Sequence, residues 1–385
     1  MELRYGTNPQ QPATVAPVVD DRWPYTVRNG RPGYINLLDA LNAWQLVQQA
    51  SRALGKPAAT SFKHVSPAGA AVAGTVDEVT AELYGVDGAS VGASTSAYLR
   101  ARDADPKSSY GDFVALSDPV DAELASVLAR VVCDGIVAPG YEPAALETLS
   151  RKKNGGFLVL QADPTFEPPA EDHRDVYGVR FTQSRDTVEI GPSVLEDAIG
   201  EPVSEQAKAD LLLGLVVLRF TQSNSTCYVR GGQALGIGAG QQSRVDCTRL
   251  AGAKVDTWWL RRHPLVRGLD FKPEVKRQDR INWQIRFIEG DLTPDERASL
   301  TAALATPPQE ELTTEQRRQW LDQLTGVAFA SDGFLPFRDN VDHAARHGVS
   351  AIAEPGGSVR AADIEAACRE HGITLVRTGL RLFHH

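Results

Sequence analysis

The 385-residue sequence has few cysteines and no long apolar run, and each shortage disfavours a class of protein. Its four cysteines, Cys133, Cys227, Cys247 and Cys368, are widely separated, and none forms a Cys-x-x-Cys pair. A zinc ribbon or a dithiol redox motif is therefore disfavoured. No uninterrupted apolar stretch approaches the ~20 residues that cross a bilayer, and the first residues form no apolar signal core. We expect reduced thiols, no membrane span and a cytoplasmic location.

A basic excess is also missing, because the net charge is −9. This composition disfavours a general nucleic-acid binder, which would carry a basic face. A small anionic substrate stays compatible with it, since a local arginine cluster binds phosphate whatever the overall charge. The length and the hydrophobic content of 42% predict two or three core-forming units.

Helix-like and strand-like segments alternate along the first part of the chain. Strands are expected over 58–62, 113–116 and 135–138, and helices over 37–54, 77–84 and 142–149. A further helix is expected to run to Val131 from a cap at Ser117 or Asp118, with Pro119 in its first turn. Strands that alternate with helices predict an α/β fold, a sheet flanked by helices.

The second part repeats features of the first. Asp118 to Asp121 resembles Asp339 to Asp342, and Ile136 to Gly140 resembles Ile352 to Gly356, in the same order and at similar offsets. We infer an internal duplication of one αβα unit, with a functional cleft near the junction of the two copies. The expected units are 1–200 and 201–385. A proline- and charge-rich connector over 164–202 joins them. Within the second unit we expect a helix-to-strand transition over 206–220 and an added helical segment over 256–320.

Lys63 and His64 stand together after an apolar run and before a turn signal, Pro67 with Gly69 two residues later. We interpret this as a strand end that runs into a turn and a helix, where α/β proteins expose catalytic groups. Lysine can deliver a proton and histidine can accept one near neutral pH. The alternative is a solvated lysine beside a structural histidine.

Four further clusters carry chemistry. Arg4 and Tyr5 open a turn-rich loop suited to phosphate, although an exposed arm is an equal alternative. The polar run 221–226 follows an apolar segment, and its Asn224 could hold a carbonyl or a developing oxyanion, a helix cap being the alternative. The glycine-rich segment 236–240 precedes a helix start at Ser243 and Arg244, an arrangement that favours an anion. It matches neither the dinucleotide fingerprint nor a P-loop.

The fourth cluster is C-terminal and comprises 332–339, 355–359 and 377–385. Its aromatic rings beside a carboxylate suit a flat heterocycle with N–H donors, and its Pro-Gly-Gly-Ser turn offers main-chain amides.

Together these clusters closely resemble the transformylase half of the bifunctional purine-biosynthesis enzymes, the 5-aminoimidazole-4-carboxamide ribonucleotide (AICAR) formyltransferases. The resemblance covers essentially the whole chain, and we expect no counterpart of the IMP cyclohydrolase domain. It implies two cytidine-deaminase-like αβα units, a homodimer with active sites at the subunit interface, and transfer of a formyl group from 10-formyltetrahydrofolate to the 5-amine of AICAR in the pathway to IMP. The zinc site of true deaminases needs a Pro-Cys-x-x-Cys segment, which is missing, so no zinc is expected; a structural potassium ion is left open.

The resemblance also assigns residues. His64 matches the proton acceptor, Lys63 the group that stabilises the transition state and protonates the leaving nitrogen, and Asn224 an amide near the transferred group. Positions that match AICAR contacts are Arg4, Tyr5, Gly111, Asp134, Arg244, Phe334 and Arg381. Positions that match folate contacts are Val245, Asp339, Ser358 and Val359.

The sequence departs from the family pattern near the substrates. Gln10 stands where the family usually has histidine, and Gly333 and Leu335 replace alanine and phenylalanine. These changes bear on affinity more than on reaction type. Two alternatives stay open: a homologue that acts on a related aminoazole nucleotide, and a non-catalytic nucleotide-binding protein. Formate as the formyl donor is disfavoured by the folate-matching positions.

Overall fold

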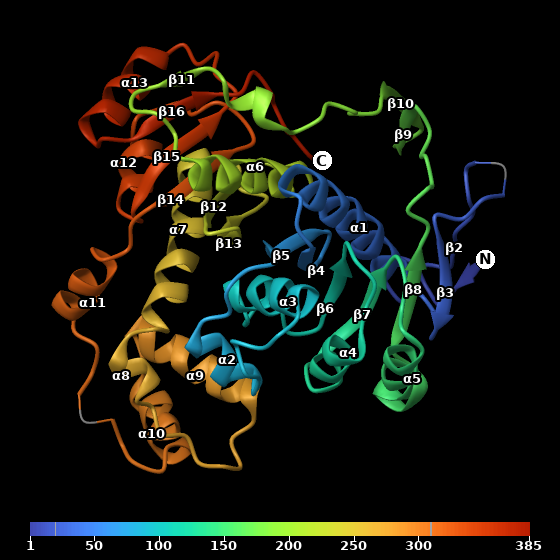
Figure 1. Cartoon of the computed structure of the whole chain (residues 1–385), viewed down its shortest axis with the longest axis horizontal. Coiled ribbons are helices and arrows are strands. Elements are labelled where there is room, and N and C mark those ends of the chain that lie inside the picture. The colour runs from blue at the N-terminus through green and yellow to red at the C-terminus, as the bar shows by residue number, and fades with distance from the viewer. Residues whose placement is uncertain (20, 309) are drawn as a thin grey trace.

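A computed structural model describes residues 1–19, 21–308 and 310–385, and it arranges them as a mixed α/β fold in three layers (Figure 1). In the described residues, thirteen helices surround one twelve-stranded sheet, and two small hairpins lie apart from it. The helices are α1 (Tyr34–Leu54), α2 (Glu78–Tyr84), α3 (Ala93–Ala104), α4 (Ala122–Ala129), α5 (Pro143–Arg151), α6 (Glu205–Arg219), α7 (Arg244–Leu260), α8 (Pro264–Arg267), α9 (Arg277–Glu289), α10 (Pro294–Ala303), α11 (Thr314–Leu321), α12 (Asp339–Ala345) and α13 (Ala361–Glu370).

The sheet strands fall into two groups along the chain. The first group is β3 (Tyr25–Asn29), β4 (Ala58–Lys63), β5 (Ser66–Val72), β6 (Asp112–Leu116), β7 (Cys133–Ala138) and β8 (Leu158–Ala162). The second group is β11 (Ala198–Ile199), β12 (Thr226–Arg230), β13 (Gln233–Gly238), β14 (Val327–Ser331), β15 (Val349–Glu354) and β16 (Thr374–Arg377). We call these the first and second halves of the sheet.

The two halves repeat one pattern of strands. Outward from the centre, the first half runs β5, β4, β6, β7, β8, β3 and the second runs β13, β12, β14, β15, β16, β11. In each half the first two pairings are antiparallel, the next two parallel and the last antiparallel. The halves join where Gln233 of β13 pairs antiparallel with Ala71 of β5. Of the segments that suggested a repeat in the sequence, Ile136–Gly140 and Ile352–Gly356 end the equivalent strands β7 and β15. Asp118–Asp121 leads up to the cap of α4, whereas Asp339–Asp342 forms the first turn of α12.

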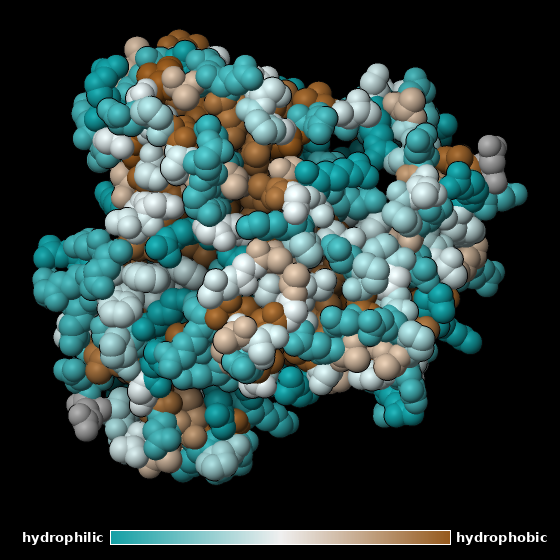
Figure 2. All heavy atoms as spheres, in the orientation of Figure 1, coloured by the Kyte–Doolittle hydropathy of each residue, from teal (hydrophilic) through white to brown (hydrophobic). Residues whose placement is uncertain are grey.

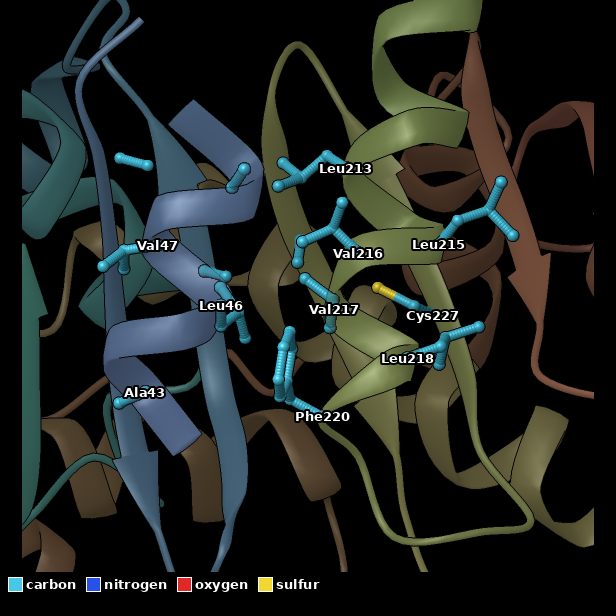
Figure 3. Packing of buried hydrophobic residues seen from close by; sticks show 14 of the residues in the cluster. Ala43, Leu46, Val47, Leu213, Leu215, Val216, Val217, Leu218, Phe220 and Cys227 are labelled. Carbon is cyan, nitrogen blue, oxygen red and sulfur yellow. The ribbon is translucent and has the colours of Figure 1, made fainter. Parts of the chain in front are cut away.

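One face of the sheet is covered by α1 and α6, which pack against each other. Figure 3 shows Leu46 of α1 facing the side of α6 that carries Leu213, Val216 and Val217, whereas Val47 lies on the side of α1 that is turned away from α6. All of these side chains are buried. The helical part of the transition expected over 206–220 is confirmed, but its strand part is wrong, because α6 continues to Arg219. Its sequence lacks a polar face because the helix lies between the sheet and α1, and an apolar run of this length does not by itself distinguish a buried helix from a strand.

The other face is covered by α3, α4 and α5 in the first half and by α7, α12 and α13 in the second. Strand residues alternate between the two faces: Phe113 and Ala115 of β6 pack towards α1, whereas Val114 and Leu116 pack towards α3 and α4. The expected helical segment is confirmed, and α8, α9 and α10 share a small core of their own around Phe287 and Leu300. None of the helices in the described ranges is long and apolar enough to cross a membrane.

Two hairpins lie outside the main sheet. One joins β1 (Glu2–Leu3) to β2 (Ala13–Thr14), and the other joins β9 (Glu171–Val176) to β10 (Val179–Ser184). The connector after β8 carries the β9–β10 hairpin, whose residues are all exposed, and short 3-10 helices occur over Lys152–Gly155 and Pro192–Leu195. Figure 1 shows this hairpin projecting from the body, and Figure 2 shows apolar residues gathering over the region of α6 and the C-terminal strands.

Two further expectations are corrected by the structure. Gly236 and Gly238 lie in β13 rather than in an anion-binding loop, because α7 packs directly over them: a Cβ on either glycine would meet a main-chain oxygen of α7 at 2.1 or 2.5 Å. The cap of α4 is Asp121, which accepts a hydrogen bond from Leu124 N at 2.8 Å. Pro119 precedes the helix, because its neighbour Val120 is still paired, through its amide, to Gly140 O.

Candidate active site

Most of the candidate residues meet at one edge of the sheet. In the first half this edge holds the β4–β5 turn and the beginnings of β6 and β7. In the second half it holds the beginning of β12 and the ends of β13, β14 and β15. We call it the site edge, and the other end of the same strands the opposite edge. Strand direction alone therefore brings distant segments of the chain together.

Lys63 and His64 lie at a β-hairpin turn. The expected turn into a helix is wrong, because Lys63 pairs with Ser66 and β5 follows at once. His64 and Val65 form the two-residue turn with φ of +53° and +58°, the left-handed conformation that a tight hairpin of this kind requires. His64 is exposed, and the Nζ atom of half-buried Lys63 donates to Tyr110 O at 2.5 Å.

A buried carboxylate lies beneath this turn. Asp39 of α1 is 5% exposed, and its Oδ1 atom accepts the amide hydrogen of Val65 at 2.7 Å. Burial raises the pKa of the Asp39 carboxyl from 3.8 to about 6, although the Val65 and His64 amides and the charge of His64 oppose that rise. The carboxylate thus fixes the turn from the side of the core.

Gly111 and Asp134 lie beside the same turn, at the beginnings of β6 and β7. Gly111 has φ of +75° and donates its amide hydrogen to Val132 O at 3.0 Å, so a left-handed glycine makes the bend before β6. Asp134 is exposed and pairs with Lys153 at 2.7 Å. Its charge reaches Asp39 and contributes to the raised pKa of that carboxyl.

The second half contributes a buried arginine. Arg244 is the first residue of α7, after the capping residue Ser243, and is 7% exposed. Its Nη1 atom pairs with Asp332, which follows β14 and is fully buried, and it also donates to Ser331 Oγ at 3.1 Å. Asp332 Oδ2 accepts from Ser223 Oγ at 2.6 Å and from Ser225 N at 2.9 Å. The ion pair therefore locks the end of β14 to the beginning of β12.

Asn224 lies within this network. Its Oδ1 atom accepts from Arg244 Nη2 at 2.7 Å, and its Nδ2 group donates to the main-chain oxygens of Gln241 and Gln242, each at 2.9 Å. All of these bonds agree on the orientation of the amide. Both of its hydrogens are already donated, so in this arrangement the side chain aligns Arg244 rather than offering a free donor.

A main-chain contact joins the β4–β5 turn to the network around Asn224 and Arg244. Gln222 donates its amide hydrogen to Ser66 Oγ at 3.4 Å and accepts one from Gly240 N at 2.8 Å. The polar run that contains Asn224 is thus attached to the turn that carries Lys63 and His64. The C-terminal segment closes the same region, because Ser223 exchanges hydrogen bonds with the main chain of His384, each at 3.0 Å.

The C-terminal cluster forms an apolar rim on the site edge. Phe334, Phe337 and Val359 are 47%, 52% and 104% exposed. The Arg360 guanidinium lies 5.3 Å from the centre of the Phe337 ring, so the segments 334–339 and 355–360 are neighbours. Asp339 and Ser358 are half-buried beside these residues, and Val245 is half-buried next to Arg244 at the start of α7.

Arg381 and the N-terminal pair lie differently. Arg381 is exposed, and its guanidinium lies 4.8 Å from the Phe383 ring; a Cβ on Gly333 would come within 2.8 Å of that ring. Arg4 lies over Tyr5 in the N-terminal arm. Among the described residues, neither Arg4 nor Tyr5 makes a hydrogen bond or ion pair with the site edge.

This geometry can be set beside known proteins. A family model described as "AICARFT/IMPCHase bienzyme" matches residues 1–254. The chain belongs to this family. It is 32% identical to the bifunctional purine biosynthesis protein PurH of Magnetococcus marinus over 390 residues, and 31% identical to that of Roseobacter denitrificans over 398 residues. Each match covers 100% of this chain and 59% of the relative, so the chain spans about three fifths of the length of these relatives.

Three members of this site were not singled out from the sequence. Asp332 and Ser223 lay within segments flagged as polar clusters, but nothing in the sequence paired them across more than a hundred residues. Asp39 could have been noticed, because it shares helical spacing with buried Ala43 and Leu46 and so places an acid on an apolar face. In the described ranges, no group of three or more histidine, cysteine or acidic side chains is arranged to hold a metal ion.

Proposed function

We propose that this protein transfers the formyl group of 10-formyltetrahydrofolate to the 5-amine of AICAR, giving formyl-AICAR and tetrahydrofolate in purine biosynthesis. The observation that carries the proposal is the joining of Lys63 and His64 to Asn224 and Arg244 at one edge, through the contact between Ser66 and Gln222. Membership of the AICARFT/IMPCHase family and the names of the relatives support it. We also propose that the repeated strand pattern represents two cytidine-deaminase-like units, 1–200 and 201–385.

His64 and Lys63 each carry out one of the two proton transfers that the reaction requires. As the amine nitrogen bonds to the formyl carbon it must lose a proton, and His64, exposed at the turn, is the acceptor. As the bond from the formyl carbon to N10 of the folate breaks, N10 must gain a proton, and Lys63 is the donor. The ammonium of Lys63 also stabilises negative charge on the formyl oxygen. Asn224 is the amide that lies near the transferred group, and its bond from Arg244 fixes its orientation.

The anionic and heterocyclic parts of the substrates match the remaining groups. Arg244 and Arg381 suit the phosphate of AICAR, with Gly111, Asp134 and Phe334 around its ring and ribose. The apolar rim suits the folate. Asp339 accepts a hydrogen bond from Asn340 Nδ2 through Oδ1 at 2.9 Å, which leaves its other oxygen for an N–H of the pterin. Val245, Ser358 and Val359 would line the same surface.

Formyl transfer by the purified chain tests the proposal. AICAR and 10-formyltetrahydrofolate are supplied and release of tetrahydrofolate is followed, with His64→Ala and, as a surface control, His173→Ala on the exposed β9 strand. We expect turnover by the parent and the control, and a loss of roughly 10²–10⁴-fold in kcat for His64→Ala, the usual worth of a general base. Binding of AICAR without turnover by the parent would contradict the proposal and favour a nucleotide-binding protein.

We further propose that the enzyme is a cytoplasmic homodimer with active sites at the subunit interface. Arg4 and Tyr5, which lie apart from the site edge of their own chain, are then the groups that a second copy would supply. Mixing Arg4→Ala protein with His64→Ala protein should restore activity, because one site of each mixed dimer would carry neither change. No gain on mixing would contradict shared sites.

A further inference from the structure

The β4–β5 turn has a structural counterpart on the opposite edge. In the second half, β12 and β13 are joined by Gly231 and Gly232, whose φ values of +60° and +75° match those of His64 and Val65. Arg230 pairs with Gln233 as Lys63 pairs with Ser66. The backbone is therefore the same at both turns, but only the second uses the residue for which a left-handed conformation carries no steric cost.

A buried aspartate lies beneath each turn. Asp39 is the sixth residue of α1 and Asp210 is the sixth residue of α6. Asp210 Oδ2 accepts from Gly231 N at 2.8 Å and its Oδ1 accepts from Gly232 N at 2.5 Å, just as Asp39 accepts from the Val65 amide. The two carboxylates thus perform one task, which is to hold the amides of a two-residue turn.

The turn at the site edge depends on its carboxylate more than the diglycine turn at the opposite edge does. Left-handed backbone is accessible to glycine without restraint, but it costs other residues roughly 1–2 kcal/mol each. The His64–Val65 turn would relax to another conformation if its amides were released, and the direction of the imidazole and of Lys63 would change with it. We propose that Asp39 is a positioning residue for formyl transfer, holding the His64–Val65 turn so that both side chains face the substrate. This rests on the proposed function.

A matched pair of substitutions tests the proposal. Asp39→Asn and Asp210→Asn each replace one acceptor oxygen by a donor at nearly constant size, and Asp39→Ala and Asp210→Ala remove both oxygens. We expect kcat to fall roughly tenfold for Asp39→Asn and 10²-fold for Asp39→Ala, the scale of a displacement of about 1 Å at reacting groups. KM for AICAR should stay within about threefold. The Asp210 variants should lower the melting temperature but leave kcat per folded molecule within about threefold.

Rescue separates positioning from general destabilisation. Val65→Gly added to Asp39→Asn supplies a residue that adopts the left-handed conformation without the carboxylate, so kcat should recover several-fold even where the melting temperature does not. Unchanged kcat in Asp39→Ala, or an equal loss in Asp210→Ala, would overturn the proposal.

A spectroscopic readout keeps this test separate from the test of the function. If the parent fails to transfer a formyl group, the proposed function fails, and the ring signals of His64 in NMR, assigned by their loss in His64→Gln, decide the structural claim. Those signals should shift or broaden in Asp39→Asn and stay in place in Asp210→Asn. Equal behaviour in the two variants would refute a positioning role for Asp39.

Discussion

The site edge and the opposite edge of the sheet share one backbone but carry different chemistry. At the turns, His64 and Val65 stand where the opposite edge has Gly231 and Gly232. At the strand ends, Asp332 follows β14 as Ser117 follows β6: each accepts the amide hydrogen of a neighbouring strand, from Ser225 at 2.9 Å and from Ala58 at 2.8 Å. Only Asp332 also pairs with a buried arginine.

The comparison shows how two ordinary differences combine into a site. The first half differs at its turn and the second half at its strand end. Because β5 and β13 pair antiparallel at the centre, the turn of one half lies at the same edge as the strand ends of the other. Each half therefore supplies a different part, and neither half alone contains the assembled set.

Giving the β4–β5 turn the two glycines of the β12–β13 turn should have the largest effect on kcat. His64→Gly with Val65→Gly removes the proposed proton acceptor, so kcat should fall by roughly 10²–10⁴-fold. The same change relieves two left-handed residues, partly offset by the greater freedom of glycine in the unfolded chain, so the free energy of unfolding should rise by about 1 kcal/mol. Denaturant unfolding beside the formyl-transfer assay checks both, and a stability loss would show that the turn is not strained.

Giving the end of β14 the serine found at the end of β6 should act mainly on stability. Asp332→Ser keeps an acceptor for the Ser225 amide but leaves Arg244 buried without its carboxylate. Loss of one partner of a buried pair costs about 3–5 kcal/mol, and we expect a fall of that size in the free energy of unfolding. The matched change on the opposite edge, Ser117→Ala, removes the bond accepted from the Ala58 amide and the bond donated to the Asp118 carboxylate, and it should cost about 2 kcal/mol. Equal costs would mean that the ion pair contributes nothing beyond the shared bond.

The last prediction concerns pH. Burial raises the pKa of Asp39 to about 6 in the folded protein, against 3.8 unfolded. Between these values the folded state binds more protons, so this group lowers the free energy of unfolding as pH rises from about 4 to 6, by up to ~3 kcal/mol. His64 and Asp134, with Lys153 beside it, are the charged groups around Asp39.

Asp39→Asn has no such titration, so the stability of the parent relative to this variant should decline over that window and be constant above it. Burial also raises the pKa of Asp210, so Asp210→Asn should show a decline in the same direction. Urea unfolding at pH 4.5 and 7 measures both differences. A difference for Asp39→Asn that does not change with pH would show that this carboxyl titrates normally.

Much of this arrangement could be predicted from the sequence, because periodicity and turn residues are local signals. The helices at 37–54 and 142–149, the strands at 58–62 and 135–138 and the added helical segment all follow from such patterns and are confirmed. The strand expected within 206–220 is wrong, because burial on both sides removes the polar face that identifies a helix. The anion-binding loop expected at the glycines of β13 is wrong, because the close approach of a helix and the close approach of a ligand both require glycine.

The sequence predicts the individual residues of the candidate site but not the residues that hold them in place. Lys63, His64, Asn224 and Arg244 were all named from local context or family resemblance. The partners that hold them, Asp39 and Asp332, depend on which strands become neighbours, and no local pattern carries that information. Residues that act on substrate are more visible in a sequence than residues that act on other residues.

The repeated strand order has a consequence for how this fold can change. A pair of identical units joined as β5 and β13 are joined here would present the same turn and the same strand ends at both edges, and so two equal sites. In this chain the opposite edge keeps the framework, with Arg230, the diglycine turn, Asp210 and Ser117, about 20 Å along the strands from the site edge. It has the framework of a second site without the chemistry of the first, and it is therefore a place where new side chains can be introduced without disturbing the existing ones.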